Sequence, residues 1–268
     1  MHVTVNSLSD GISVSVHSRK KETSLLSNHT HSYNEIYFLC TGTARFFAGN
    51  EIINIRQGEI VFMRSGIIHK TMYNAGEYSK RLFICFDDNF VGKEYQKITN
   101  DMGNKKYIVL PPLKSIETEK LIQGLLKEYS DKETHYTKMC KCMLGELLVM
   151  LSRLEEANSV KTLSANEIIM QNAAKYITEH FFDDFTLPAL AEKFAMSPSY
   201  FSKTFKAATG FGVSEYITAV RIANAEKLLT HSDISVTDAA SKCGFNDSNY
   251  FAAVFKKKTA LLLINFPL

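Results

Sequence analysis

The sequence predicts an α+β protein with an N-terminal β-barrel, a connecting pair of helices and a C-terminal all-α domain. Short apolar runs separated by glycine and polar turns fill residues 1–112, a pattern typical of a barrel or sandwich of short strands. Helical periodicity replaces this pattern in residues 113–157. Residues 166–268 read as helix and contain an internal repeat, which indicates a duplicated supersecondary unit.

Within the first region, the predicted strands are runs such as EIYFLC, ARFFA, EIINI, EIVFM and RLFICF, and Pro111-Pro112 ends the region. The next segment predicts two amphipathic helices joined near residues 130–134. The polar stretch at residues 158–165 is the predicted linker to the last domain.

Composition excludes some classes of protein and leaves others open. The net charge is +3, and residues 166–268 carry as many acidic as basic side chains, so charge alone does not indicate a nucleic-acid partner. No apolar run approaches the ~20 residues that span a bilayer. The N-terminus has no charged start followed by an apolar block, so we expect a cytoplasmic location and no membrane partner. The five cysteines form no CxxC pair, which favours free thiols over a zinc site.

The repeat lies in residues 187–210 and 236–260, which match at an offset of 49 and then, after one inserted residue, of 50. Each copy predicts a short helix, a tight turn and a second helix. The turns fall at Ala195-Met196 and Gly244-Phe245, and the predicted caps of the second helices are Ser197 and Asn246. In each second helix two phenylalanines four residues apart define a buried face.

The opposite face of each second helix is small and polar at its start and basic at its end. Such a face suits a major groove, where small polar groups reach base edges and lysines hold phosphates. The predicted DNA-contacting residues are Ser199, Ser202, Lys203, Lys206, Ser248, Asn249, Ala252, Ala253, Lys256 and Lys257. A spacer helix over residues 213–229 would be ~25 Å long, which suits recognition helices about one DNA turn apart. The alternative is a pair of helical hairpins that serves only as a protein-interaction module.

Residues 166–260 resemble the DNA-binding domain of the AraC/XylS family of bacterial transcription regulators. The resemblance is carried by LAEKFAMSPSYFSKTFKAATG, YITAVRIANAEKLL and AASKCGFNDSNYFAAVFKK. It implies two helix–turn–helix motifs that read adjacent major grooves of double-stranded DNA, with RNA polymerase as a partner if the protein is an activator. By position it implies base contacts from Ser199, Ser202 and Lys203, and from Asn249, Ala252 and Ala253. Two alanines in the second copy imply a weaker or methyl-reading half-site.

The stretch HTHSYNE at residues 29–35, together with QGEIVFMRSGIIHK, resembles the two motifs of cupin barrels. On one strand, every second residue from His29 to Glu35 would share a face. The second motif departs from the cupin pattern, since Arg64 stands at the usual proline and Tyr73 at the usual asparagine.

We expect these residues to bind a small-molecule effector, a polyhydroxylated or acidic compound with a sugar as one candidate. The predicted effector-binding residues are His29, His31, Tyr33, Glu35, Arg45, Arg64 and His69. Two alternatives remain: histidines with a purely structural role, and a metal held by His29, His31, Glu35 and His69 in a metal-dependent cupin enzyme whose helical half is an interaction module. Sensory cupins in the resembled family usually bind an organic effector, so we expect no metal, no cofactor and no enzymatic activity.

The resemblance also implies that the helical pair at residues 113–157 forms a homodimer contact. The alternative is that its apolar faces only cover the barrel. The chain ends in TALLLINFPL, where the first copy of the repeat continues with Gly210 and a further helix. Two readings remain for this tail: residues that pack against the second copy, or the product of a frameshift.

Overall fold

The computed structural model describes residues 8, 10–19, 31, 33–72, 78–102, 107–110, 116–154 and 163–259. Within these ranges, the side chains of Arg19, Tyr107, Ile108, Ile116, His231 and residues 257–259 are outside the description. His29 and the tail from Ala260, both singled out above, lie outside the described residues.

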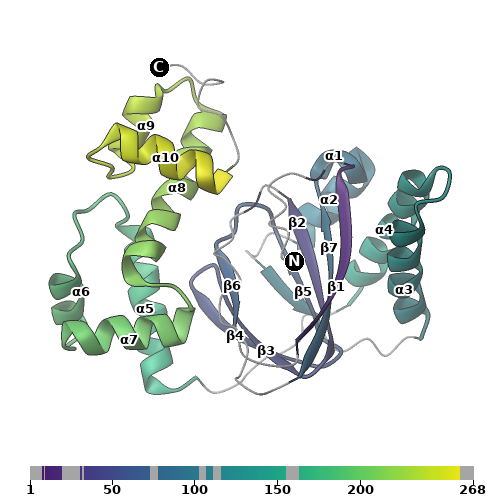
Figure 1. Ribbon diagram of the computed structural model, residues 1–268, viewed down its shortest axis with the longest axis horizontal. Helices are drawn as coiled ribbons and strands as arrows, with labels where there is room; N and C mark the ends of the chain where they lie inside the picture. Colours follow the sequence, from purple (N-terminus) through teal and green to yellow (C-terminus); the bar gives the residue numbers. More distant parts are fainter. Residues whose placement is uncertain are drawn as a thin grey trace.

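The N-terminal half contains two antiparallel sheets that face each other (Figure 1). The strands of the larger sheet are β1 (Ile12–Arg19), β2 (Asn34–Thr41), β5 (Ile60–Met63), β7 (Ser79–Phe86) and β8 (Tyr107–Leu110), in the order β1-β7-β2-β5-β8. The strands of the smaller sheet are β3 (Thr43–Ala48), β4 (Glu51–Arg56) and β6 (His69–Met72), in the order β4-β3-β6. No ladder joins the two sheets in the described strands, so the barrel is open there.

Both sheets are covered on both faces, which explains their nearly continuous apolar runs. In β2, Tyr37 and Leu39 belong to the core between the sheets, whereas Ile36 and Phe38 belong to a second core under helices. Side chains alternate between faces along a strand, so a strand buried on both sides loses its polar positions.

Four helices accompany the larger sheet: α1 (Asp88–Val91), α2 (Lys93–Met102), α3 (Ile116–Asp131) and α4 (Tyr136–Ser152). The helices α3 and α4 were predicted, and their apolar faces share the core of the larger sheet through residues such as Leu125 and Leu147. The sequence prediction missed α1 and α2, because α1 is only four residues long and most residues of α2 are polar, inside a strand-rich region.

The C-terminal half is all helix, which confirms the predicted α+β class. Its helices are α5 (Ala165–Glu179), α6 (Leu187–Lys193), α7 (Pro198–Thr209), α8 (Val213–His231), α9 (Val236–Lys242) and α10 (Ser248–Thr259). We call α6 and α7 the first unit, and α9 and α10 the second unit. Figure 1 shows the two units near opposite ends of α8. None of the described helices is long and apolar enough to cross a bilayer.

The N-caps of the second helices differ between the two units. Ser197 caps α7 by accepting from the backbone N–H of Tyr200, as predicted. The prediction of Asn246 as the cap of α10 is wrong, because Asp247 Oδ1 accepts from Tyr250 N at 3.1 Å and α10 begins at Ser248. The carboxylate of Asp247 reaches the first-turn N–H groups, so the cap falls one residue later than expected.

The smaller sheet rests on the first unit (Figure 1). Phe47 in β3 is fully buried in a cluster of helical side chains that includes Phe211 and Tyr216. At the β3–β4 turn, Asn50 Oδ1 accepts hydrogen bonds from the hydroxyls of Thr178 and Tyr216. The barrel and the first unit therefore share an apolar core sealed by polar bonds at the tip of a hairpin.

Candidate functional site

Most of the recognition face of α7 is exposed. Ser199, Lys203 and Lys206 are exposed and Ser202 is half-buried, whereas Phe201 and Phe205 on the other side are fully buried. The spacing of three and four residues places the predicted DNA-contacting residues on one helical face.

The helix α10 repeats this arrangement at an offset of 50 residues. Ser248, Asn249, Ala253 and Lys256 are exposed, and Ala252 is half-buried like its counterpart Ser202. The side chain of Lys257 lies outside the description. The two faces therefore match in position and differ in chemistry, because Lys203 corresponds to Ala253.

The helix α8 connects the units and is fastened at its middle by Arg221. Its guanidinium donates to the carbonyl oxygens of Phe181 at 2.8 Å and Asp183 at 2.7 Å. It also lies within 6.0 Å of the ring centre of Phe245, in the turn of the second unit. Arg221 thus ties the loop after α5 to the second unit.

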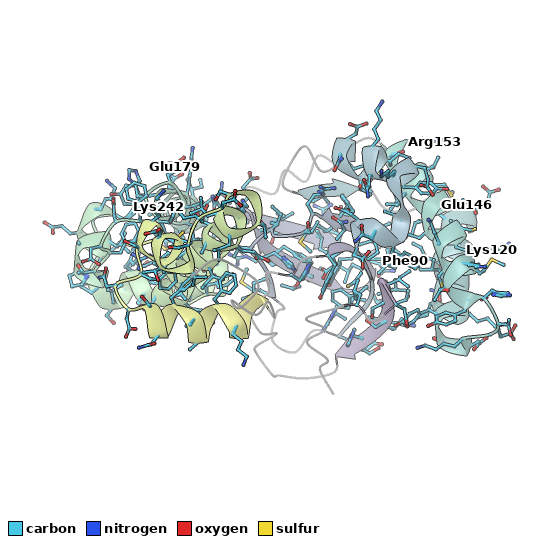
Figure 2. All side chains as sticks on the ribbon, turned by 90° about the horizontal axis from the view of Figure 1, so that it is seen from above. Phe90, Lys120, Glu146, Arg153, Glu179 and Lys242 are labelled. Atoms are coloured by element: carbon cyan, nitrogen blue, oxygen red, sulfur yellow. The ribbon has the colours of Figure 1, made fainter. Side chains whose placement is uncertain are left out.

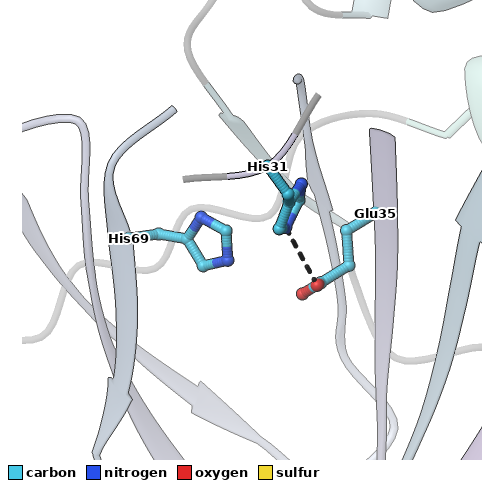
Figure 3. A group of neighbouring side chains, drawn as sticks. All are labelled: His31, Glu35 and His69. Carbon is cyan, nitrogen blue, oxygen red and sulfur yellow. Dashed lines mark ion pairs between the residues drawn. The ribbon is translucent and has the colours of Figure 1, made fainter. Parts of the chain in front are cut away.

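A second set of residues meets at one end of the barrel. His31, Glu35 and His69 bring their ligand atoms within 4.8 Å of one another, and Figure 3 shows all three converging. We call these three residues the acceptor cluster. Glu35 and His69 are buried, at 7% and 5% exposure. The residues come from the segment before β2, from β2 and from β6.

The backbone fixes the tautomer of both histidines. The Nδ1 atom of His31 lies 2.8 Å from the carbonyl oxygen of Tyr33, and Nδ1 of His69 lies 2.9 Å from that of Ile67. A carbonyl only accepts, so each Nδ1 carries a proton, and in the neutral form of each ring the lone pair is on Nε2. The Nε2 atom of His31 is 3.4 Å from a carboxylate oxygen of Glu35. With neutral histidines the cluster presents acceptors, which suit a donor-rich ligand or a cation, whereas a protonated His31 would donate to Glu35.

Tyr33 and Cys85 border this cluster. The ring of Tyr33 stacks on His31 at 3.8 Å between centroids, and Cys85 is paired with Glu35 in the β2–β7 register. Burial raises the pKa of both groups, and the charge of Glu35 adds to the effect. Both side chains therefore stay protonated at neutral pH.

The structure brings together only part of the predicted effector set. His31, Tyr33, Glu35 and His69 meet, but His31 and Tyr33 precede β2, so the expectation of one strand carrying all of them is wrong. The chain bends at Tyr33 before β2 begins, and the N–H of Gly66 donates to the carbonyl of His31. Arg64 lies in the turn after β5, where its buried Nη1 has no hydrogen-bond partner among the described residues.

Arg45 lies elsewhere, at the contact between the barrel and the first unit. Its Nη2 is 2.5 Å from Glu167 Oε1, and both side chains line an open hollow of about 370 Å³ beside α7. Sequence spacing could not predict this ion pair, because Glu167 is 122 positions further along the chain.

The strand β6 connects the acceptor cluster to the first unit. His69 contributes to the cluster, while the next residue, Lys70, donates from Nζ to the carbonyl of Gly210 at 2.6 Å. Lys70 is 7% exposed and lies 5.0 Å from the ring centre of Phe211. Neighbouring residues of a strand point to opposite faces, so one strand reaches both places.

Two family models match this chain: the ExsA N-terminal regulatory domain over residues 34–163 and a helix-turn-helix domain over residues 190–266. The second match spans both units around α8. The chain belongs to the AraC family of transcription regulators. This AraC-family regulator thus combines a DNA-binding helix–turn–helix domain with an N-terminal regulatory domain.

Relatives of this AraC-family regulator include the HTH-type transcriptional activator RhaR from Salmonella typhi, 22% identical, and from Escherichia coli O9:H4, 21% identical. Each alignment covers 88% of this chain and 85% of the relative. Among solved structures, ToxT from Vibrio cholerae O395 is 14% identical, with a TM-score of 0.40 over 94% of this chain and 95% of that one. The C-terminal domain of AraT from Geobacillus stearothermophilus is 29% identical, with a TM-score of 0.36 over 39% of this chain and 85% of that one.

Proposed function

We propose that this protein is an effector-responsive activator of transcription, which works in the cytoplasm and reads two successive major grooves. The observation that carries this proposal is the matching pair of exposed faces on α7 and α10, held near opposite ends of α8. The length of α8, 19 residues or about 28 Å at 1.5 Å per residue, fits recognition helices about one DNA turn apart. The activator role is supported by the names of the RhaR relatives.

The acceptor cluster is the proposed effector site. When both histidines are neutral, their two lone pairs and the carboxylate accept hydrogen bonds, so a neutral polyol such as a sugar fits better than an acidic compound. A carboxylate ligand would meet Glu35 at close range and would be repelled.

A panel of monosaccharides, tested by thermal shift, examines the effector class. We expect at least one sugar to raise the melting temperature of the wild type and to have no effect on Glu35→Gln. A sugar that stabilises both proteins equally would place the effector elsewhere, and stabilisation only by acidic compounds would contradict the assigned class.

The strand β6 is the proposed route of the signal. A ligand that moves His69 also moves Lys70, whose ammonium holds the end of α7 through the carbonyl of Gly210. Ligand binding would then bias the position of the first unit on the barrel, which is a shift between two arrangements of the same chain.

We also propose a homodimer formed through α3 and α4, with RNA polymerase as a further partner. The apolar faces of both helices cover the larger sheet, so their outer sides are available for the contact. Figure 2 shows Lys120 and Glu146 on these outer sides, and Met139 there is 52% exposed. Sedimentation of the wild type and Met139→Asp tests this contact: a dimer that dissociates in the variant supports it, and a monomeric wild type contradicts it.

A metal site is the second candidate function, because the acceptor cluster has three ligand atoms within 4.8 Å and both histidines in the metal-binding tautomer. His29, the fourth residue expected to take part, lies outside the described residues. Metal analysis of purified protein separates the candidates. Stoichiometric metal that is lost in His31→Ala favours a metal-dependent cupin enzyme, and metal-free protein that still responds to a sugar favours the effector site.

The DNA-reading role is tested by selecting duplexes from a random library and measuring affinity and salt dependence. Removing the charge in Lys203→Ala should weaken DNA binding. If Lys203 contacts a base, the variant should also lose its base preference at one position, at a cost of about 1–3 kcal/mol. If Lys203 contacts a phosphate, the variant should bind all sequences more weakly by the same factor. Lys175→Ala on α5 is the matched control, because Lys175 is exposed, pairs with Glu179 on its own helix and is not a predicted DNA contact. Wild-type affinity of Lys203→Ala would contradict the role.

A further inference from the structure

Two half-exposed tyrosines occupy the same place in both units. Tyr200 is 49% exposed and Tyr250 is 53% exposed, and they correspond at the repeat offset of 50. The sequence prediction of DNA contacts did not include either of them. A large aromatic side chain left in water twice, at equivalent positions, indicates a surface that meets a partner.

Both tyrosines stand at the third position of their helices, at the end that enters a groove. Their backbone N–H groups are bound by the caps Ser197 and Asp247, so the first turns are fixed. The next residue in each helix, Phe201 or Phe251, is fully buried. The tyrosine rings therefore flank the recognition faces, and the ring of Tyr250 also lies 6.3 Å from that of Phe245 at the edge of the core of the second unit.

The hydroxyl of Tyr200 is already oriented by a neighbour. Asn166 Nδ2 donates to this oxygen at 3.0 Å, which leaves the phenolic proton free to be donated outward. The ring lies beside Lys203 at the hollow along α7, so the phenol and the ammonium share one border of the recognition face.

We propose that Tyr200 and Tyr250 are backbone-contacting residues, one in each half-site, whose rings pack on deoxyribose and whose hydroxyls donate to phosphate oxygens. Tyrosine is among the side chains that bind phosphate oxygens and fix the register of a protein on DNA. The pair would position both recognition helices independently of sequence, and its matched geometry compensates for the unequal base-reading residues. This proposal rests on the DNA-reading role given above.

The test compares Tyr200→Phe and Tyr250→Phe with the wild type, using a duplex selected from a random library and a scrambled duplex of equal length. Each variant loses only a hydroxyl, so the fold is kept, and thermal melting checks this. We expect each to bind both duplexes about tenfold more weakly, the loss for a hydrogen bond to a charged acceptor. The slope of affinity against salt should stay unchanged, because a neutral donor displaces no counterion.

Tyr78→Phe is the matched control, since Tyr78 is 46% exposed but lies in the barrel before β7. The proposal would be overturned if both test variants bound DNA with wild-type affinity. It would also be overturned if they lost affinity only for duplexes that carry one particular base pair. Normal DNA binding with lost transcription would also overturn it and would favour a protein partner. If the wild type selects no sequence, the DNA-reading role fails, while the scrambled duplex still tests the phosphate contacts.

Discussion

The two helix–turn–helix units have the same fold but different surroundings. The core around the first unit includes Phe47 and Ile52 of the barrel, whereas the core of the second unit contains helical and loop residues of the C-terminal half alone among the described residues. The recognition faces differ in the same direction, with Lys203 in the first unit and Ala253 in the second.

This difference indicates a division of labour. The first unit packs against the regulatory half, and its predicted base-contacting residue Lys203 has a charged donor that Ala253 lacks. The second unit follows through α8 and Arg221, so it receives any movement of the barrel only indirectly.

The largest expected effect is a loss of stability whose consequences for hydrogen exchange differ between the two faces of β3. Phe47→Ala should cost about 3–5 kcal/mol, because it leaves a cavity between the barrel and the first unit. Hydrogen exchange should then increase in α7 and α8 and stay unchanged in α9 and α10. Phe46→Ala is the matched control, since Phe46 is equally buried but faces the core between the sheets. Equal exchange patterns in the two variants would contradict the assigned interface.

A smaller effect is expected from Lys70→Met, which keeps the apolar stem and removes the donor to Gly210. Losing a hydrogen bond from a charged donor should lower the free energy of unfolding by about 1.5–3 kcal/mol. Denaturant unfolding measures this loss, with exposed Lys80→Met as the control. Equal stability of the two variants would show that the bond does not hold the first unit on the barrel.

Substitutions in the turns of the two units should change the stability of the protein in opposite directions. Ala195 adopts φ 55° and Gly244 adopts φ 78°, both in the left-handed region. Gly244→Ala should destabilise by about 1–2 kcal/mol, since its Cβ would also meet Arg221 at 3.0 Å. Ala195→Gly should be neutral or slightly stabilising, because relief of the strain offsets the added chain entropy. Thermal unfolding that gives both changes the same sign would refute this explanation.

The smallest expected effect is a loss of stability at acidic pH. Although burial opposes it, hydrogen bonds from Ser164 and the charge of Arg45 lower the pKa of Glu167. A lowered pKa stabilises the fold above the ordinary carboxyl value, near 4.3, and this contribution is lost as the pH falls through the lowered pKa. We expect under about 1 kcal/mol, because solvent screens a partly exposed pair. Unfolding measured from pH 6 to 3 should show this loss in the wild type and not in Glu167→Gln.

The sequence predicted the local features well and the distant contacts poorly. The paired phenylalanines and the turns at Ala195 and Gly244 repeat within each unit, so comparing the copies identified both second helices. The helix α2 was missed because its exposed polar residues hide the few that pack, such as Thr99 and Met102. The base contacts and effector contacts stay predictions.

Side chains that act across the fold were the hardest to place. Arg45 was assigned to the effector site, but the structure pairs it with Glu167 at the contact between the domains. The convergence of His31, Glu35 and His69 was expected from the cupin motifs, although the bend before β2 was not. Periodicity shows which face a residue occupies, but only the fold shows what that face meets.

The most direct test of the central claim is a footprint of the wild-type protein on the duplex it selects from a random library. We predict two protected major-groove segments, with centres about one helical turn (~34 Å) apart and stricter base preference in the segment bound by α7. Protection of a single segment, or no selected sequence at all, would contradict the account of two DNA-reading units on one spacer helix.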